Sequence, residues 1–159
     1  MEHKNDLGRL ICHASVLIRR DLDRAVAQAT GDPTLSGRNI WVLRYLADHR
    51  EEPVHQKDLE IAFRIRRSTV SCTVELMEQK GLLERRSVNG DGRMKRLCIT
   101  ESGERILAVT KNTLEAYEES LMQGISPEDY QAATSLLEAL CSHLEEGSPM
   151  NNEKERNEN

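Results

Sequence analysis

The stretch that decides the fold runs from residue 66 to residue 100 and reads RRSTVSCTVELMEQKGLLERRSVNGDGRMKRLCIT. Val70, Val74 and Met77 recur in it at helical spacing, which predicts a helix over residues 66–80 with these side chains facing inward. The opposite face carries mostly short polar side chains, namely Ser68, Ser71, Cys72 and Glu75. Gly81 follows, and its missing side chain suits the left-handed conformation that commonly ends a helix.

A β-hairpin is predicted directly after this helix. Residues 82–88 and 96–100 are short runs compatible with strands. The turn-rich residues 89–92, Asn-Gly-Asp-Gly, can supply the positive φ angles that a tight hairpin turn requires. The hairpin would therefore carry Arg93 near its tip.

Three helices are predicted upstream. One long helix ends near Gly31, and its apolar stripe is Leu7, Ile11, Ala14, Ile18, Leu22, Ala25 and Ala29. The next helix lies between Ser36 and Glu51, with apolar positions at Trp41, Val42, Tyr45 and Leu46. A short third helix spans residues 55–63.

Two helices are predicted downstream. Thr100 is placed to accept hydrogen bonds from first-turn amides, and the helix that it caps continues to Gly124. Pro127 suits the first position of a last helix, whose apolar stripe is Ala133, Leu137, Leu140 and Leu144. Residues 148–159 have no apolar periodicity and are expected to form a disordered tail.

The charge of the chain is unevenly distributed. The 159 residues carry a net charge of −5, which by itself argues mildly against a polyanionic partner. Residues 64–96 nevertheless hold nine basic and four acidic residues, a local charge of +5, and the remaining 13 basic and 23 acidic residues give −10. The 38% apolar content is low for a self-contained globule, so we expect a partner to cover part of the apolar surface.

Three short helices followed by a hairpin are the order of a winged helix-turn-helix, in which the last helix enters the major groove of DNA. The predicted fold class is mainly α: this winged domain, with long helices before and after it. Short polar side chains let a helix approach base edges, and basic side chains bind phosphate or guanine. The alternative is an ordinary solvated helix and turn. The candidate DNA-contacting residues are Lys57, Arg66, Arg67, Ser68, Thr69, Ser71, Cys72, Arg93, Lys95 and Arg96.

Four segments of this sequence resemble the MarR family of bacterial regulators. They are residues 67–71 (RSTVS), 76–85 (LMEQKGLLER), 91–93 (DGR) and 97–103 (LCITESG). Together with the placement of the flanking helices, the resemblance covers about 140 residues. The sequence departs from the family at Cys72, where many members carry a larger polar or basic residue, and this puts a base-specific contact there in doubt.

The resemblance implies a homodimer that represses transcription from a palindromic operator, with Arg93 in the minor groove. A cytoplasmic location is expected from the lack of a membrane-spanning or signal-like apolar run. The resemblance also divides the chain into an N-terminal dimerisation helix (1–34), a winged DNA-binding domain (35–103), C-terminal dimerisation helices (104–147) and the tail. Two-fold symmetry would place the two reading helices about one DNA turn, roughly 34 Å, apart.

A small, often phenolic, effector is a further implication of the resemblance. Its candidate lining residues are His13, Leu17, Trp41 and Tyr45, although aromatic residues at helical spacing usually pack in the core, and this is the favoured interpretation of the four. Cys12 lies on the first helix, where a peroxide-sensing branch of the family carries its reactive thiol, and this gives a thiol-redox regulator as an alternative. No metal or other cofactor is expected, because a site built from histidines such as His3, His13, His49, His55 and His143 would need convergence that no spacing shows.

Other function classes find little support. The sequence has no nucleophile elbow, phosphate loop, zinc-protease motif or dinucleotide fingerprint, so an enzyme is not expected. It has no apolar run long enough for a membrane span, and its four cysteines lie far apart. The remaining rival is a winged domain that binds protein, and it differs from a DNA-binding domain in the salt dependence of its binding.

Overall fold

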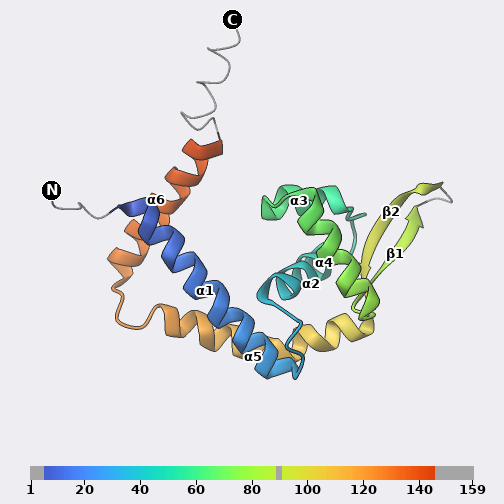
Figure 1. Cartoon of the computed structure of the whole chain (residues 1–159), viewed down its shortest axis with the longest axis horizontal. Coiled ribbons are helices and arrows are strands. Elements are labelled where there is room, and N and C mark those ends of the chain that lie inside the picture. Colours follow the sequence, from blue (N-terminus) through green and yellow to red (C-terminus); the bar gives the residue numbers. More distant parts are fainter. Residues whose placement is uncertain (1–5, 89–90, 146–159) are drawn as a thin grey trace, which may run out of the picture. The chain divides into compact units, whose positions relative to one another are not determined.

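The computed structural model describes residues 6–88 and 91–145, and for residue 88 and residues 91–94 it describes the backbone alone. Within these ranges the chain forms six helices and one two-stranded antiparallel sheet (Figure 1). In chain order they are α1 (Leu7–Thr30), α2 (Gly37–Asp48), α3 (Gln56–Phe63), α4 (Arg67–Gln79), β1 (Leu83–Val88), β2 (Asp91–Ile99), α5 (Glu101–Leu121) and α6 (Pro127–Glu145). The expected order of a winged helix-turn-helix is confirmed. The tail and His3 lie outside the described residues.

The chain divides into two compact units, Met1–Tyr117 and Glu118–Asn159. In the first unit, α2, α3, α4 and the base of the hairpin share one apolar core, which Val26 of α1 joins. Its most deeply buried large side chains, each at most 1% exposed, include Ile40, Leu43, Leu59, Met77 and Leu83. Burial of each such side chain contributes about 1.5–3 kcal/mol, so this core holds the short helices in place.

Local sequence sets the helix ends. Gly31 and Gly81 have φ angles of +69° and +66°, the left-handed conformation that ends α1 and follows α4. The Thr100 hydroxyl accepts a hydrogen bond from the Gly103 amide at 3.1 Å and so caps α5. All three ends agree with the sequence prediction.

The hairpin is longer than predicted. β2 begins at Asp91 instead of residue 96, and it pairs with β1 from Leu83 opposite Ile99 to Ser87 opposite Lys95. The register then shifts, and Val88 lies opposite Asp91. The prediction missed these residues because it relied on strand-compatible runs and on the turn-rich residues 89–92, whereas main-chain pairing beside a register shift needs no such side-chain signal.

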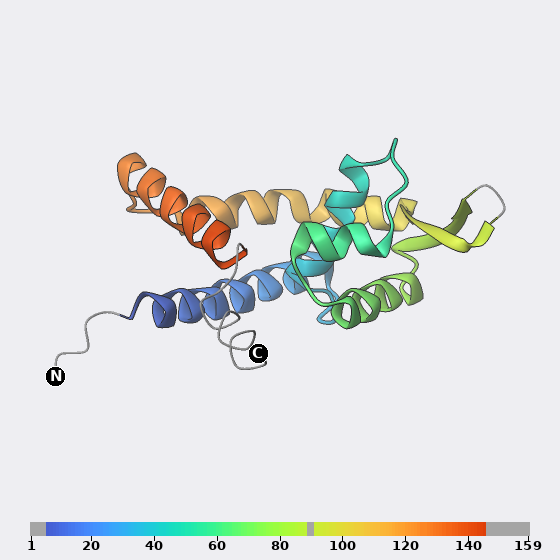
Figure 2. The ribbon, with the colours of Figure 1, turned by 90° about the horizontal axis from the view of Figure 1, so that it is seen from above.

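The segment before α3 fastens the hairpin to the helices. The Leu97 amide donates a hydrogen bond to the Val54 carbonyl oxygen at 2.7 Å, and Nδ1 of His55 donates to the Lys95 carbonyl oxygen at 2.9 Å. Figure 2 shows the hairpin projecting beyond the helices of this unit, so its outer part depends on such anchors.

Trp41 was predicted as an apolar position of α2, but it does not lie in the core of the single chain. The buried side of α2 is formed by Ile40, Val42, Leu43 and Leu46. Trp41 is 50% exposed because it lies on another side of the helix, whereas Tyr45 is half-buried and packs against this core.

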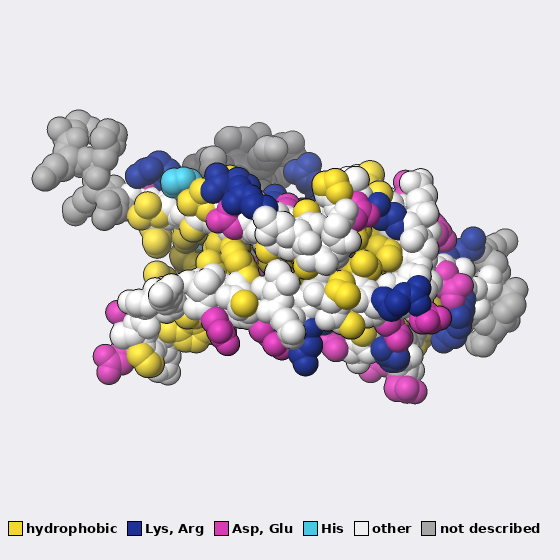
Figure 3. Space-filling model, turned by 90° about the horizontal axis from the view of Figure 1, so that it is seen from below, with side chains coloured by type: hydrophobic (Ala, Val, Ile, Leu, Met, Phe, Trp, Pro, Cys, Tyr) yellow, Lys and Arg dark blue, Asp and Glu magenta, His cyan; other side chains and the backbone are white. Residues whose placement is uncertain are grey.

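Apolar side chains remain exposed on several helices. On α1 they are Leu7, Leu10, Val16, Leu17 and Ile18, and on α6 they are Tyr130, Leu136, Leu137 and Leu144. No residue of α6 is buried in the chain as described. Figure 3 shows many hydrophobic side chains (yellow) at the surface.

Among the described residues, no helix combines the length and apolarity needed to cross a membrane.

Candidate nucleic-acid interface

The exposed face of α4 is small and polar near its amino end. Val70, Val74 and Met77 are at most 1% exposed and fix the inward face, as the helical spacing predicted. Ser68 and Cys72 are exposed, and Thr69 and Ser71 are half-buried. From Ser68 to Cys72 the surface of the helix therefore carries only short side chains, so a flat or grooved partner can approach its backbone closely.

Four exposed basic residues belong to the winged domain: one on α3, two at the start of α4 and one on β2. Arg66 is the N-cap residue of α4 and Arg67 its first residue, Lys57 lies in the first turn of α3, and Lys95 lies on β2. None of the four forms an ion pair in the described part of the chain, and the Arg66 side chain makes no capping hydrogen bond. The side chain of Arg93 lies outside the described residues.

Three other cations of the basic segment are engaged within the protein. Lys80 pairs with Asp32, Arg85 with Glu78, and Arg86 with Glu84. The charge count from the sequence treated all of them alike. The structure distinguishes the paired cations from the unpaired ones. The acidic partner of Lys80 lies in a turn 48 residues away, so no local sequence pattern reveals this pair.

Arg96 lies on the other face of the hairpin. Side chains alternate along a strand, and Leu97, next to Arg96, is buried in the core. Arg96 faces a cavity beside the carboxyl end of α2, opposite Arg86 on β1. Arg85, on the alternate face of β1, pairs with Glu78 of α4. The structure therefore separates Arg96 from the α4 side of the hairpin, where Lys95 lies.

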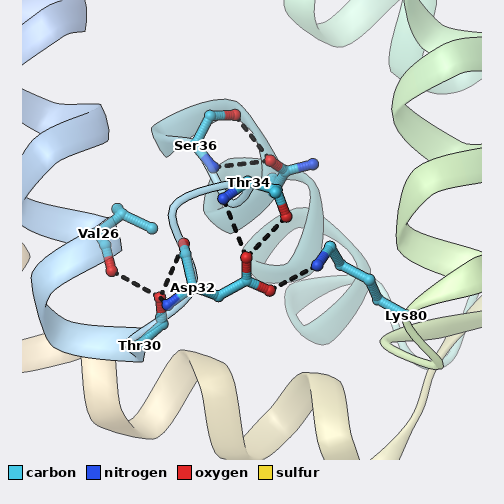
Figure 4. A network of polar contacts seen from close by, with 7 residues as sticks. Val26, Thr30, Asp32, Thr34, Ser36 and Lys80 are labelled. Carbon is cyan, nitrogen blue, oxygen red and sulfur yellow. Dashed lines mark hydrogen bonds and ion pairs between the residues drawn. The ribbon is translucent and has the colours of Figure 1, made fainter.

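A polar network holds the carboxyl end of α4 (Figure 4). Nζ of Lys80 lies 2.5 Å from Oδ2 of Asp32. Oδ1 of Asp32 accepts hydrogen bonds from the Thr34 amide at 2.9 Å and the Thr34 hydroxyl at 2.7 Å. The hydrogen bond from Lys80, followed by those from Thr34, lowers the pKa of Asp32 from 3.8 to about 2. The turn after α1 is thus joined to α4 by an ion pair that persists at neutral pH.

The candidate effector residues do not gather into one pocket within the single chain. His13, Leu17 and Trp41 are exposed. Tyr45 stacks on His49, with ring centroids 4.0 Å apart, and contacts Phe63 edge to face at 5.7 Å. Cys12 is an exposed thiol on α1. No group of three metal-ligating side chains was found among the described residues.

Comparison with known proteins agrees with this arrangement. Residues 34–94 match the family model described as MarR family. The solved structure of the transcription regulator MarR from Oenococcus oeni PSU-1 shares 26% sequence identity, covers 86% of this chain and 99% of that chain, and has a TM-score of 0.68. The chain is therefore similar to the MarR family over residues 34–94. The matched region contains α3 and α4, with Lys57, Arg66 and Arg67 of the candidate interface, and it ends one residue before Lys95.

Two further structures show the same fold. The S. aureus MepR–DNA complex is 21% identical, covers 88% of this chain and 99% of that chain, and has a TM-score of 0.79. The heme sensor protein PefR from Streptococcus agalactiae in complex with heme is 24% identical, covers 90% of this chain and 95% of that chain, and has a TM-score of 0.64. The chain therefore shares its fold with a solved transcription regulator and with a protein solved in complex with DNA.

Proposed function

We propose that this chain is a MarR-family regulator that binds duplex DNA as a homodimer and represses transcription from an inverted-repeat operator. The single observation that carries the proposal is the exposed small polar face of α4, which begins at two arginines that have no ion-pair partner among the described residues. In a winged helix-turn-helix, the last helix enters the major groove and its amino-terminal residues contact base edges. Ser68 and Ser71 would hydrogen-bond there, and Arg66 and Arg67 would bind phosphate or guanine.

The remaining candidate contacts lie on the neighbouring elements. Lys57 in the first turn of α3 and Lys95 on β2 would bind phosphates on either side of the groove, and Arg93 would enter the minor groove beside it. The MepR structure is a DNA complex of a protein with the same fold, which supports the docking geometry. Arg96 is left out of the proposed contact surface because it lies on the opposite face of the hairpin.

A homodimer is proposed from the exposed apolar surface. Val16 on α1 is 62% exposed and Leu144 on α6 is 60% exposed, and other apolar side chains of these helices are similarly uncovered. Burial of apolar surface contributes about 25 cal/mol per Å², so a second copy that covers these helices would stabilise both chains. Two-fold symmetry then duplicates α4 and requires an operator whose half-sites are related by inversion.

The test is selection of bound fragments from random and genomic DNA by the full-length chain. We expect enrichment of an inverted repeat with half-site centres about 34 Å apart. Arg93→Ala should then weaken binding to the selected site without lowering the melting temperature of the protein. Absence of any enriched sequence, or enrichment of sites without inverted symmetry, would contradict the proposal.

Salt separates this function from a protein-binding winged domain. Binding through several phosphates weakens steeply as salt rises, whereas an apolar protein interface does not. Repression is tested by placing the selected operator across a promoter upstream of a reporter gene. Reporter output should fall when the chain is expressed, and a rise would show an activator. Release by a small effector is tested by repeating the DNA titration with phenols and oxidants.

A further inference from the structure

Beyond the short side chains at its amino end, the exposed face of α4 also carries a carboxylate. Glu75 is exposed, and it follows Ser68 by seven residues, Ser71 by four and Cys72 by three. A helix turns by about 100° per residue, so these four side chains fall on one face. The buried face of the same helix, which includes Met77, lies on the opposite side.

The spacing of these four residues is one that reads bases. In the homeodomain, a variant of the helix-turn-helix, residues of one helix at spacings of three, four and seven contact the bases of the major groove. From Ser68, the same spacings reach Ser71, Cys72 and Glu75. A helix rises about 1.5 Å per residue, so Glu75 lies about 10 Å along the axis from Ser68. Successive bases are about 3.4 Å apart, so the two side chains would reach different base pairs.

Glu75 has no partner within the described part of the protein. The other acidic residue of α4, Glu78, pairs with Arg85. Glu75 forms neither an ion pair nor a side-chain hydrogen bond in residues 6–88 and 91–145. A carboxylate that leaves water beside a polyanion lowers the affinity of the complex unless a hydrogen-bond donor reaches it. The proposed DNA surface therefore contains a negative charge that needs a donor from the bases.

We propose that Glu75 reads a cytosine in each half-site of the operator, with its carboxylate accepting a hydrogen bond from the cytosine N4 amino group. This inference rests on the proposed function, because it requires α4 to enter the major groove. The donors on the major-groove edges are the amino groups of cytosine and adenine. In adenine the amino group lies beside the N7 acceptor, which repels a carboxylate, whereas the cytosine edge has no acceptor.

The same carboxylate selects against thymine. Thymine presents the O4 acceptor where cytosine presents its amino group, so a thymine at this position would leave the Glu75 charge without a donor. Discrimination of this kind arises from repulsion of the wrong base as much as from attraction of the right one. Glu75 is thus a residue that determines specificity, whereas the arginines at the start of the helix bind DNA of any sequence where they contact phosphate.

The first test compares the sites that three full-length proteins select from random duplex DNA: the wild type, Glu75→Gln and Glu75→Ala. The wild type should require a cytosine at one position of each half-site. Glu75→Gln should select adenine at that position, because a glutamine amide can donate to N7 and accept from N6. Glu75→Ala should accept several bases there, since its methyl group makes no hydrogen bond. The rest of the site should be the same for all three proteins.

The second test is a double-mutant cycle between Glu75 and that base pair. Replacing the C·G pair by T·A in one half-site should lower the DNA affinity of the wild type by about tenfold or more. The same replacement should change the DNA affinity of Glu75→Ala by less than about threefold. All titrations are made at one salt concentration, because DNA affinity falls steeply as salt rises.

Glu51→Gln is the control for the loss of a negative charge. Glu51 is exposed in the turn after α2 and has no ion pair among the described residues, so the charge change equals that of Glu75→Gln. The control should keep the base preference of the wild type. Melting curves of all variants test folding, and no loss of stability is expected because both glutamates are exposed.

The failure of this inference is distinct from the failure of the proposed function. Equal base preferences of the wild type and both Glu75 variants would overturn the inference and leave the proposed function intact. So would a gain in affinity of Glu75→Gln by one common factor for every sequence, which would show a carboxylate that lies near phosphates and contacts no base. If the wild type enriches no sequence at all, the proposed function fails, and the inference fails with it.

Discussion

Arg66→Gln should reduce the salt dependence of DNA binding without destabilising the protein. Arg66 is exposed, forms no ion pair among the described residues and makes no side-chain capping contact, so the substitution removes a charge and little else. The expected effect therefore falls on the polyanion partner. If Arg66 contacts the DNA backbone, the substitution should weaken binding to all DNA sequences by a similar factor.

The magnitude follows from the number of exposed cations. Lys57, Arg66, Arg67 and Lys95 from each chain give about eight phosphate contacts per dimer, and the slope of log K against log salt is about −0.9 per contact, or about −7. Arg66→Gln removes two contacts per dimer and leaves a slope of about −5. Between 50 and 200 mM salt the wild type should lose about 2 × 10⁴ in affinity and the variant about 2 × 10³.

Fluorescence anisotropy with a labelled operator at several salt concentrations measures both slopes. The control is Arg105→Gln, which makes the same charge change on α5, where Arg105 pairs with Glu101 at 2.6 Å. The Thr100 hydroxyl donates to the Gly81 carbonyl oxygen at 2.6 Å, so α5 begins beyond the carboxyl end of α4, about 20 Å along the helix from Arg66. The control should keep the wild-type slope. Equal slopes for Arg66→Gln and wild type, or equal losses in both variants, would refute the assignment of Arg66 to the DNA surface.

Three further predictions concern stability and assembly. Gly103→Ala should destabilise the protein by about 2 kcal/mol, lowering the melting temperature by roughly 4–8 °C, because the new Cβ would lie 2.2 Å from the Leu82 carbonyl oxygen, a backbone atom. Asp32→Asn should lower the free energy of unfolding at pH 7, because it removes the carboxylate that pairs with Lys80. This difference should persist above pH 3.8 and shrink as the pH falls towards about 2, since the pKa of Asp32 is depressed in the folded chain. Val16→Glu should shift the protein from dimer to monomer in analytical ultracentrifugation, because Val16 is a strongly exposed apolar side chain on α1.

Each of these has a control or a contradicting result. Gly8→Ala, on α1, should leave the melting temperature unchanged or raise it, because its new Cβ would be 3.6 Å from the nearest atom, an ordinary contact. A difference between wild type and Asp32→Asn that is equally large at pH 7 and pH 2 would show that the carboxylate charge is not responsible. Arg19→Glu changes an exposed residue of α1 that is not apolar, and it should remain dimeric; monomers in both variants would point to a charge effect.

The sequence by itself determined the order of the helices and the inward face of α4. Val70, Val74 and Met77 lie on one face of any helix that contains them, because the helical repeat fixes their angles before any neighbour is present. Gly81 and Thr100 set helix ends through properties of single residues, the missing Cβ and the capping hydroxyl. These local rules were enough to predict the order of a winged helix-turn-helix and the small polar face of α4.

Only the tertiary structure decided which cations are available to a partner. Lys80 and Asp32 meet across a sequence separation of 48 residues, and Arg96 is separated from Lys95 by the alternation of a strand whose true start the sequence did not show. A count of charges does not say where each side chain lies in the folded chain. An ion pair, or the face of the hairpin on which a residue lies, depends on which distant segments the core brings together. The core that brings them together forms by burial of apolar side chains from all parts of the first unit, so no short stretch of sequence contains that information.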